Sequence, residues 1–143
     1  HLAGLVINKT TRTKLQKIFQ VKGFKTINIS DLVYSGGPAN QANIRMMHTH
    51  ECKCKHTLPL ANGISKTSDP QMLKKMHEQD QPQAWRVFSG LSIWSPGQLE
   101  GEINSKCWMT AIPTPELSLE TPTTQIYEKA IEICSKQIID KYI

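Results

Sequence analysis

The densest group of candidate metal ligands in this sequence lies in one short stretch, His-Thr-His-Glu-Cys-Lys-Cys-Lys-His. Its histidines and cysteines all share one parity: His48, His50, Cys52, Cys54 and His56. On a single β-strand such residues lie on one face, with neighbours about 6 to 7 Å apart at Cα. Two or three of them could then share a zinc or copper ion. Five ligands on a flat face would still need a bulge or turn to converge, so an exposed polar strand end or loop is the alternative.

Motifs that carry catalysis are missing from the sequence. It has no Gly-x-x-x-x-Gly-Lys phosphate loop, no Gly-x-Ser-x-Gly elbow and no His-Glu-x-x-His helix. Glu100 and Glu102 stand two apart on an expected helix, so they diverge and do not form a carboxylate pair. Glu100 fits better as a solvated acid in the first helical turn. We therefore expect no catalytic residue and no cofactor.

Positive charge is concentrated near the beginning of the chain. Lys and Arg number 17 and Asp and Glu 12, a net charge of +5, yet residues 1 to 30 contain no acid. The cations of this segment are Lys9, Arg12, Lys14, Lys17, Lys22 and Lys25. A basic segment on a near-neutral body suits an anionic partner such as nucleic acid, an anionic lipid surface or an acidic protein. The alternative is a solvated face that keeps the protein soluble.

Size and composition indicate one globular domain. The 143 residues are 38% hydrophobic and 20% charged, enough to bury a core without disulfide or metal staples. No apolar run approaches the roughly 18 residues that span a bilayer, and no secretory signal is evident. The cysteines, which include Cys107 and Cys134, lack the spacing of a secreted disulfide framework. We expect a soluble protein of the cytoplasm, or of an organelle's matrix or stroma.

Short strands alternate with capped helices along the chain. The patterns predict strands at residues 4–8, 32–35, 44–49, 85–91 and 107–112, and a forced turn at 36–38. Helices are expected from about 13 to 22, from 70 to about 79, just after 97, and from 122 to the end. Met72, Leu73 and Met76 should face inward. This alternation predicts a layered α/β or α+β domain.

The segment from Val87 to Glu100 is the most distinctive one. Gly90 and Gly97 permit close backbone approach, and a helix that begins directly after a strand points free N–H groups at the strand end. An anion or a carboxylate could sit there. The structural alternative is that Trp94 packs on the core, Ser95 caps the helix, and the glycines relieve crowding.

Residues 90–103 resemble the Gly-Tyr-Ala-Gly-Trp-x-x-Gly-Gln-Leu-Glu-x-Glu-Ile signature of the bacterial YqgE/AlgH family. Residues 4–9, Gly-Leu-Val-Ile-Asn-Lys, are similar to that family's Gly-Leu-Ile-Val-Asn-Lys segment. The resemblance continues through Gly36-Gly37-Pro38, with His48 ten residues later, and through Trp108 to Pro122. These motifs stand in the family's order and cover most of the chain, which is therefore identified as a member.

The resemblance implies a single domain over residues 1–143, with a twisted, partly barrel-like mixed sheet flanked by helices. It transfers no catalytic residue, because none is established for the family. It makes the motif residues candidates for a shared surface or for fold maintenance: Gly36, Gly37, Pro38, Trp94, Gly97, Gln98, Leu99 and Glu100. Leu91 and Ile93 replace the tyrosine and second glycine of the signature. Family members carry an opening strand segment before the position of Gly4. We therefore expect either that the chain is processed or truncated, or that a partner supplies those strands to an exposed sheet edge.

Two functional hypotheses follow. The first is a non-enzymatic binding or regulatory domain, in line with the label of transcriptional regulator that the family carries, which contacts nucleic acid through its basic first helix. The second is a structural accessory subunit of a larger assembly, such as an organellar ribosome or a respiratory complex, held by a protein partner. A small-molecule or metal-dependent enzyme ranks third. The oligomeric state does not follow from the sequence.

Overall fold

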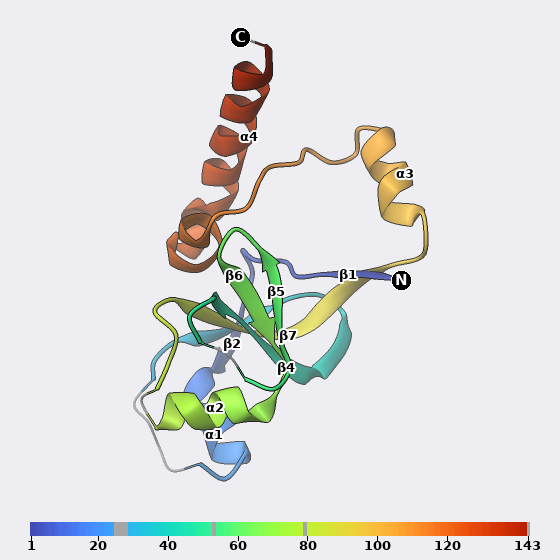
Figure 1. Cartoon of the computed structure of the whole chain (residues 1–143). Coiled ribbons are helices and arrows are strands. Elements are labelled where there is room, and N and C mark those ends of the chain that lie inside the picture. The colour runs from blue at the N-terminus through green and yellow to red at the C-terminus, as the bar shows by residue number, and fades with distance from the viewer. Residues whose placement is uncertain (25–28, 53, 79, 143) are drawn as a thin grey trace.

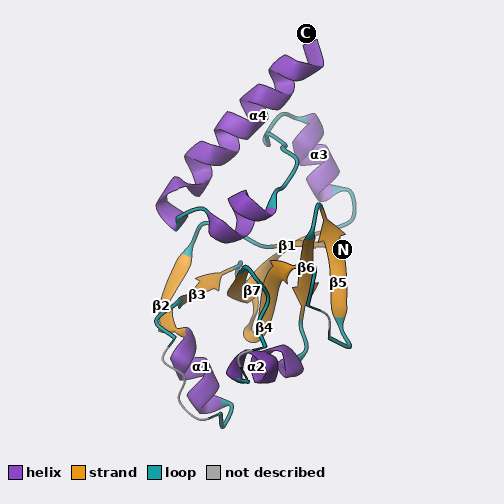
Figure 2. Ribbon diagram, turned by 60° about the vertical axis from the view of Figure 1, so that its left-hand side comes forward, coloured by secondary structure: helices purple, strands orange, loops and turns teal. Residues whose placement is uncertain are grey.

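The chain folds into an open mixed β-sheet with helices on both faces (Figure 1, Figure 2). The computed structural model describes residues 1–24, 29–52, 54–78 and 80–142, and side chains as far as residue 137. The strands are β1 (Leu2–Gly4), β2 (Thr10–Lys14), β3 (Leu32–Ser35), β4 (Ala39–Thr49), β5 (Thr57–Ala61), β6 (Ile64–Thr67) and β7 (Trp85–Trp94). The helices are α1 (Leu15–Val21), α2 (Pro70–His77), α3 (Gln98–Asn104), η1 (Glu116–Glu120, a π-helix), η2 (Thr123–Gln125, a 3₁₀-helix) and α4 (Ile126–Tyr142).

Strand β7 organises the sheet, whose order is β2-β3-β7-β4-β6-β5. Its first half pairs in parallel with β3, with Tyr34 opposite Phe88, and its last residues pair antiparallel with β1, with Gly4 opposite Ser92. Strand β4 runs antiparallel along its other side. The predicted class, a helix-flanked mixed sheet, is confirmed, and the sheet stays open and does not close into a barrel. No helix in the described ranges is both long and apolar enough to span a membrane.

Adjacent residues of the central strands bury side chains on opposite faces. Met46 and Val87 join the core beneath α1 and α2, together with Leu15, Phe19, Val33, Met72, Leu73 and Met76. Their neighbours Met47 and Phe88 join a second cluster on the other face, with Ile64, Ala84 and Leu119. Because strand side chains alternate, a slip of one residue would exchange the two cores, so burial on both faces fixes the register.

Helix α2 forms as its sequence predicts. Asp69 is the N-cap, its carboxylate accepts a hydrogen bond from the backbone N–H of Gln71 at 2.9 Å, and Pro70 occupies the first turn. Met72, Leu73 and Met76 are buried, which confirms the inward face that their spacing predicted.

The hairpin β5–β6 lies between β4 and α2 along the chain, where the sequence patterns predicted no strand. Its turn is Asn62–Gly63, with φ angles of 49° and 82°. This Asn-Gly pair is the strongest short signal for a two-residue hairpin turn, because both residues tolerate positive φ. Hairpin formation places β5 at one edge of the sheet, with Pro59 in its middle. Strand β2 forms the opposite edge.

Three expectations were wrong. The strand expected at residues 4–8 does not form, because β1 pairs with the end of β7 through Leu2–Gly4 and ends there. The first helix begins at Leu15 and not near Thr13, because residues 10–14 pair with β3 as strand β2, and Lys14 precedes the helix without a side-chain cap. Residues 107–112 form no strand. The backbone N–H of Ile112 instead donates to the side chain of Gln137 on α4 at 3.1 Å.

Three glycines allow the β3–β4 turn to cross β7 at backbone contact distance. A Cβ atom on Gly36 would lie 2.4 Å from the carbonyl oxygen of Gly90, and one on Gly90 would lie 2.3 Å from that of Gly37. Real Cβ atoms do not approach so closely, and the φ of +75° at Gly90 also disfavours any other residue. The backbone N–H of Gly36 donates to the carbonyl of Ser89 at 2.8 Å, which anchors the crossing.

This crossing predicts a large cost for a single methyl group. Gly90→Ala should lower the free energy of unfolding by about 2 to 4 kcal/mol, because it combines overpacking with a left-handed backbone. Gly101→Ala is the matched control. It lies in α3 with open space around its Cα, and should raise the free energy of unfolding by up to about 1 kcal/mol. Urea unfolding measures the free energy of unfolding of both variants. Equal changes in Gly90→Ala and Gly101→Ala would contradict the steric role of Gly90.

Candidate functional site

The family-motif residues predicted from the sequence divide between two places. Gly36 and Gly37 lie against the backbone of β7, where they maintain the fold, and Pro38 is exposed beside them. The second group, from Trp94 to Glu100, leads from the end of β7 into α3, which projects from the sheet (Figure 1). The structure therefore does not gather the motif residues into one site.

The start of α3 differs from the expected arrangement. Gly97, with φ of +79°, is the N-cap, and Ser95 contributes no side-chain cap. The side-chain oxygen of Gln98 accepts a hydrogen bond from the backbone N–H of Ser95 at 3.0 Å. Leu99 is half-buried and Glu100 is exposed in the first turn. These contacts close the turn between β7 and α3.

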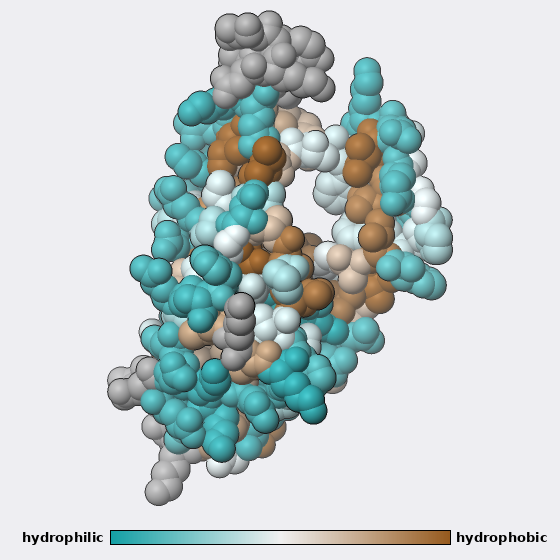
Figure 3. All heavy atoms as spheres, in the orientation of Figure 1, coloured by the Kyte–Doolittle hydropathy of each residue, from teal (hydrophilic) through white to brown (hydrophobic). Residues whose placement is uncertain are grey.

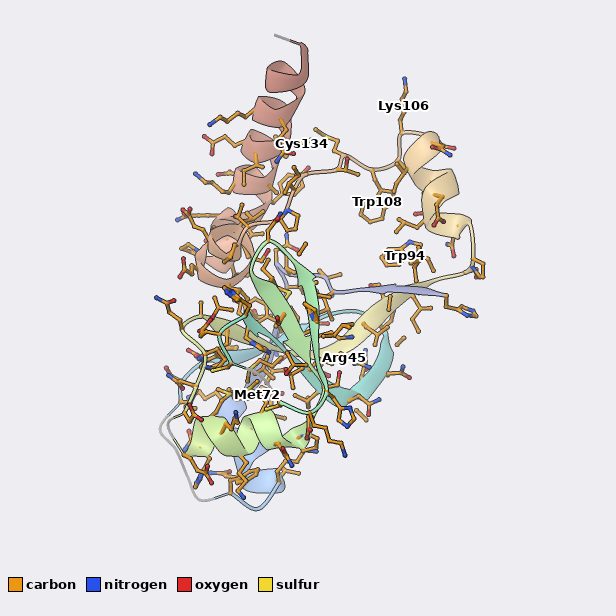
Figure 4. The ribbon with its side chains drawn as sticks, viewed as in Figure 1. Arg45, Met72, Trp94, Lys106, Trp108 and Cys134 are labelled. Atoms are coloured by element: carbon orange, nitrogen blue, oxygen red, sulfur yellow. The ribbon has the colours of Figure 1, made fainter. Side chains whose placement is uncertain are left out.

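A carboxylate that the sequence analysis set aside organises this region. Glu102 accepts hydrogen bonds from the indole N–H of Trp108 at 2.7 Å and from the side-chain amide of Gln98 at 3.2 Å. The rings of Trp94 and Trp108 meet edge to face, with centroids 6.2 Å apart beside α3 (Figure 4). The Trp108 hydrogen bond holds the pKa of Glu102 below its usual value. Glu102 thus fixes the segment after α3, and no spacing pattern in the sequence marks this contact.

The basic residues of the first 30 positions fall into two groups. Arg12 and Lys14 on β2 and Lys17 on α1 are exposed and line one shallow hollow, together with Thr13, Gln16 and Gln20. Lys22 lines a different hollow, on the side of Asp69, and Lys9 is exposed before β2. Lys25 lies outside the described residues. The basic surface around this hollow therefore takes two cations from strand β2 and one from helix α1.

The histidine- and cysteine-rich stretch is not one strand. Strand β4 ends at Thr49 and β5 begins at Thr57, with turns between them, so the five candidate ligands do not share a face. Among the described residues, no three His, Cys, Asp or Glu side chains are grouped to hold a metal ion. Burial raises the pKa values of the Cys52 and Cys54 thiols, which keeps both protonated at neutral pH and disfavours the thiolate that binds metals.

His48 is a buried member of the sheet. Its Nδ1 lies 2.7 Å from the backbone carbonyl of Thr49, and its Nε2 lies 2.8 Å from the hydroxyl of Thr67. The Thr67 hydroxyl is in turn 2.8 Å from that of Thr57, which accepts from the backbone N–H of Cys54 at 2.7 Å. Both ring nitrogens are therefore engaged in a chain of hydrogen bonds that joins β4, β6 and β5.

Comparison with known proteins places the sequence in a family. A family model described as AlgH-like matches residues 1–138. The chain belongs to the AlgH-like family. Among its AlgH-like relatives, a UPF0301 protein of Vibrio parahaemolyticus is 30% identical over 100 residues, which cover 70% of this chain and 54% of that protein. A UPF0301 protein of Proteus mirabilis is 29% identical over 137 residues, covering 91% and 73%. The chain thus spans from about half to three quarters of the length of these relatives.

Solved structures of the AlgH-like fold superpose on this chain. The solution structure of the AlgH protein from Pseudomonas aeruginosa matches with a TM-score of 0.77 at 23% identity, over 92% of this chain and 71% of that one. The crystal structure of a Corynebacterium diphtheriae protein matches with a TM-score of 0.61 at 22% identity, over 80% and 61%. At this identity the likeness establishes the fold.

The burial of His48 predicts a pH dependence of stability. Desolvation lowers its pKa in the folded state below the usual value of about 6.5, so the unfolded chain binds the proton more tightly. The contribution of His48 is complete above pH 6.5 and is lost as pH falls below that value, by at most about 1.4 kcal/mol per pH unit. Urea unfolding between pH 7.5 and 5 should show this slope.

His48→Gln should flatten the slope, because glutamine does not titrate. His56→Gln is the matched control, since His56 is exposed in the loop before β5. Identical pH slopes for the parent protein and His48→Gln would contradict the assignment of the effect to His48.

Proposed function

We propose that this chain is a non-enzymatic binding domain that contacts nucleic acid through the basic surface formed by Arg12, Lys14 and Lys17. The observation that carries the proposal is the shared hollow into which β2 and α1 bring these three cations. Arg12 and Lys14 lie on one side of β2 because they are two residues apart. Lys17 follows within the first turn of α1.

The charge around this hollow favours a polyanion. No acidic side chain lines it, and Asp31 at the start of β3 lies outside the lining. In the described part of the chain, none of the three cations forms an ion pair with a carboxylate. Phosphates that bind such a surface release condensed counterions, which makes the affinity fall steeply with salt. The polar Thr13, Gln16 and Gln20 add hydrogen-bond donors for phosphate oxygens.

The notable polar side chains elsewhere support a binding role over catalysis. The Glu102 carboxylate is engaged by Trp108, and the ring of His48 is engaged by Thr49 and Thr67. These contacts give both side chains a role in holding the fold together. A regulatory role in transcription would use the same basic surface on duplex DNA.

The proposal predicts salt-dependent binding to duplex DNA or RNA that is largely independent of sequence. Combining Lys14→Glu with Lys17→Glu should weaken binding and should lower the slope of log affinity against log salt by about two, one for each phosphate contact removed. Fluorescence anisotropy with a labelled duplex over a range of salt concentrations measures both quantities.

Combining Lys106→Glu with Lys136→Glu is the matched control, because it changes the net charge equally at exposed sites outside the hollow. Binding that is absent, independent of salt, or weakened equally by both pairs would refute the nucleic-acid role.

A structural accessory role is the second candidate, and exposed apolar side chains favour it. The segment after α3 and the start of α4 expose Trp108, Met109, Ile112, Tyr127 and Ile131 by 39 to 67%. All of these except Ile112 line a groove between that segment and α4, beside an opening in the molecule between α3 and α4 (Figure 3). Contiguous apolar surface of this kind marks protein interfaces.

This role predicts that the chain occurs in a larger particle. Met109→Lys combined with Tyr127→Lys should shift the chain to the monomer fraction when native extract is separated by gel filtration, because a charge in an apolar interface is costly. The exposed pair Gln71→Lys and Gln81→Lys adds the same charge outside both the apolar groove and the basic hollow, and should leave the elution unchanged. A parent chain that elutes as a monomer would rule the accessory role out.

A further inference from the structure

An apolar cavity of about 300 Å³ lies on the face of the sheet opposite α1 and α2. Strand β1 and the residues after it form one wall, β4 and β7 form the floor, and the β5–β6 hairpin forms the other wall. The apolar side chains that line it are Leu5, Ile7, Met47, Leu60, Ile64 and Leu91. The half-exposed Leu60 marks its open side.

Two cations share this apolar space. In the register of β4 and β6, Lys66 stands opposite Met47, and Arg45 is two residues from Met47 on the same strand. Alternation therefore places Arg45 and Lys66 on the cavity face as diagonal neighbours. Both line the cavity, whose lining contains no acidic side chain. Figure 4 shows Arg45 within the sheet, near β1.

Arg45 carries an unmet hydrogen-bond donor. Its Nη1 atom is buried and has no partner, in contrast to every other buried side-chain nitrogen or oxygen of the described residues. A guanidinium group has five N–H donors and no acceptor, so Nη1 can be satisfied only by a group that accepts a hydrogen bond. A buried, unpaired donor on a charged group is costly, and an anion that accepts from it would remove that cost.

We propose that this cavity binds a small organic monocarboxylate with an apolar body. The carboxylate accepts hydrogen bonds from Arg45, whose planar fork matches its two oxygens, and lies near the ammonium group of Lys66. The apolar body lies among Met47, Leu60 and Leu91. A water molecule occupies about 30 Å³ in the liquid, and we take the same volume for each non-hydrogen atom of a ligand. The cavity then holds about ten non-hydrogen atoms. An eight-carbon fatty acid has this size.

The site is separate from the nucleic-acid surface of the proposed function. Arg12, Lys14 and Lys17 lie on β2 and α1, at the other end of the sheet order from the β5–β6 hairpin. Failure of nucleic-acid binding would therefore leave the carboxylate proposal intact. Failure of carboxylate binding would likewise leave the nucleic-acid proposal intact.

The test is titration of the whole chain with sodium octanoate, followed by calorimetry and by amide NMR shifts. Octanoate should bind saturably at one site and shift residues of β1, β4 and β6. Octanol, which lacks the charge, and acetate, which lacks the apolar body, should each bind at least 10-fold more weakly. Equal binding of octanoate and octanol, shifts confined to other elements, or absence of saturable binding would overturn the proposal.

Variants distinguish the loss of a binding charge from the loss of the fold. Arg45→Met should weaken octanoate binding at least 10-fold while the melting temperature of the free protein stays equal or rises, because the unpaired donor is gone. Lys66→Met should weaken binding about threefold and provides a second readout if Arg45→Met does not fold. Arg12→Met, on the distant basic surface, is the matched control and should bind octanoate as the parent does. Unchanged affinity in both cavity variants would refute the role of these cations.

Discussion

Backbone atoms of the β3–β4 turn and of β7 lie closer together than any side chain would allow. This contact, made by Gly36, Gly37 and Gly90, decides where β3 ends and where β4 must start on the other side of β7. Because β7 is the strand to which β1, β3 and β4 all attach, an error at the crossing would displace both halves of the sheet. Gly36, Gly37 and Gly90 are thus explained by steric fit, without any ligand.

The elements that could be predicted from the sequence are those set by local signals. Asp69 and Pro70 define the start of α2, and the Gly36-Gly37-Pro38 turn ends β3. The elements that were missed depend on partners far away in the chain. Strand β2 exists because β3 returns beside it, and its residues would serve equally well at the start of a helix. Residues 107–112 are mostly apolar, as a buried strand is, yet all six are exposed and the segment pairs with no strand of the described sheet.

The candidate sites also divide into residues that local sequence signals identify and residues that only distant contacts identify. The sequence analysis identified the basic residues, and the structure then separates Lys22 from Arg12, Lys14 and Lys17. Arg45 gave no signal, because a lone arginine in a strand is ordinary until its neighbours prove to be apolar and its donor proves to be unpaired. The pairing of β4 with β6 brings Lys66 beside Arg45, and the sequence of neither strand alone predicts this pairing.

Strand β5 illustrates how the molecule limits self-association. It is an outer strand and exposes Leu58 by 54% and Leu60 by 50%, a pattern that would otherwise template the addition of strands and the growth of fibrils. Pro59 stands between these two leucines, and its missing N–H and its ring interrupt any ladder that an incoming chain could build there. At the opposite margin, Arg12 and Lys14 repel a second copy of the same strand. A proline at one edge and cations at the other therefore disfavour strand addition to a sheet that stays open.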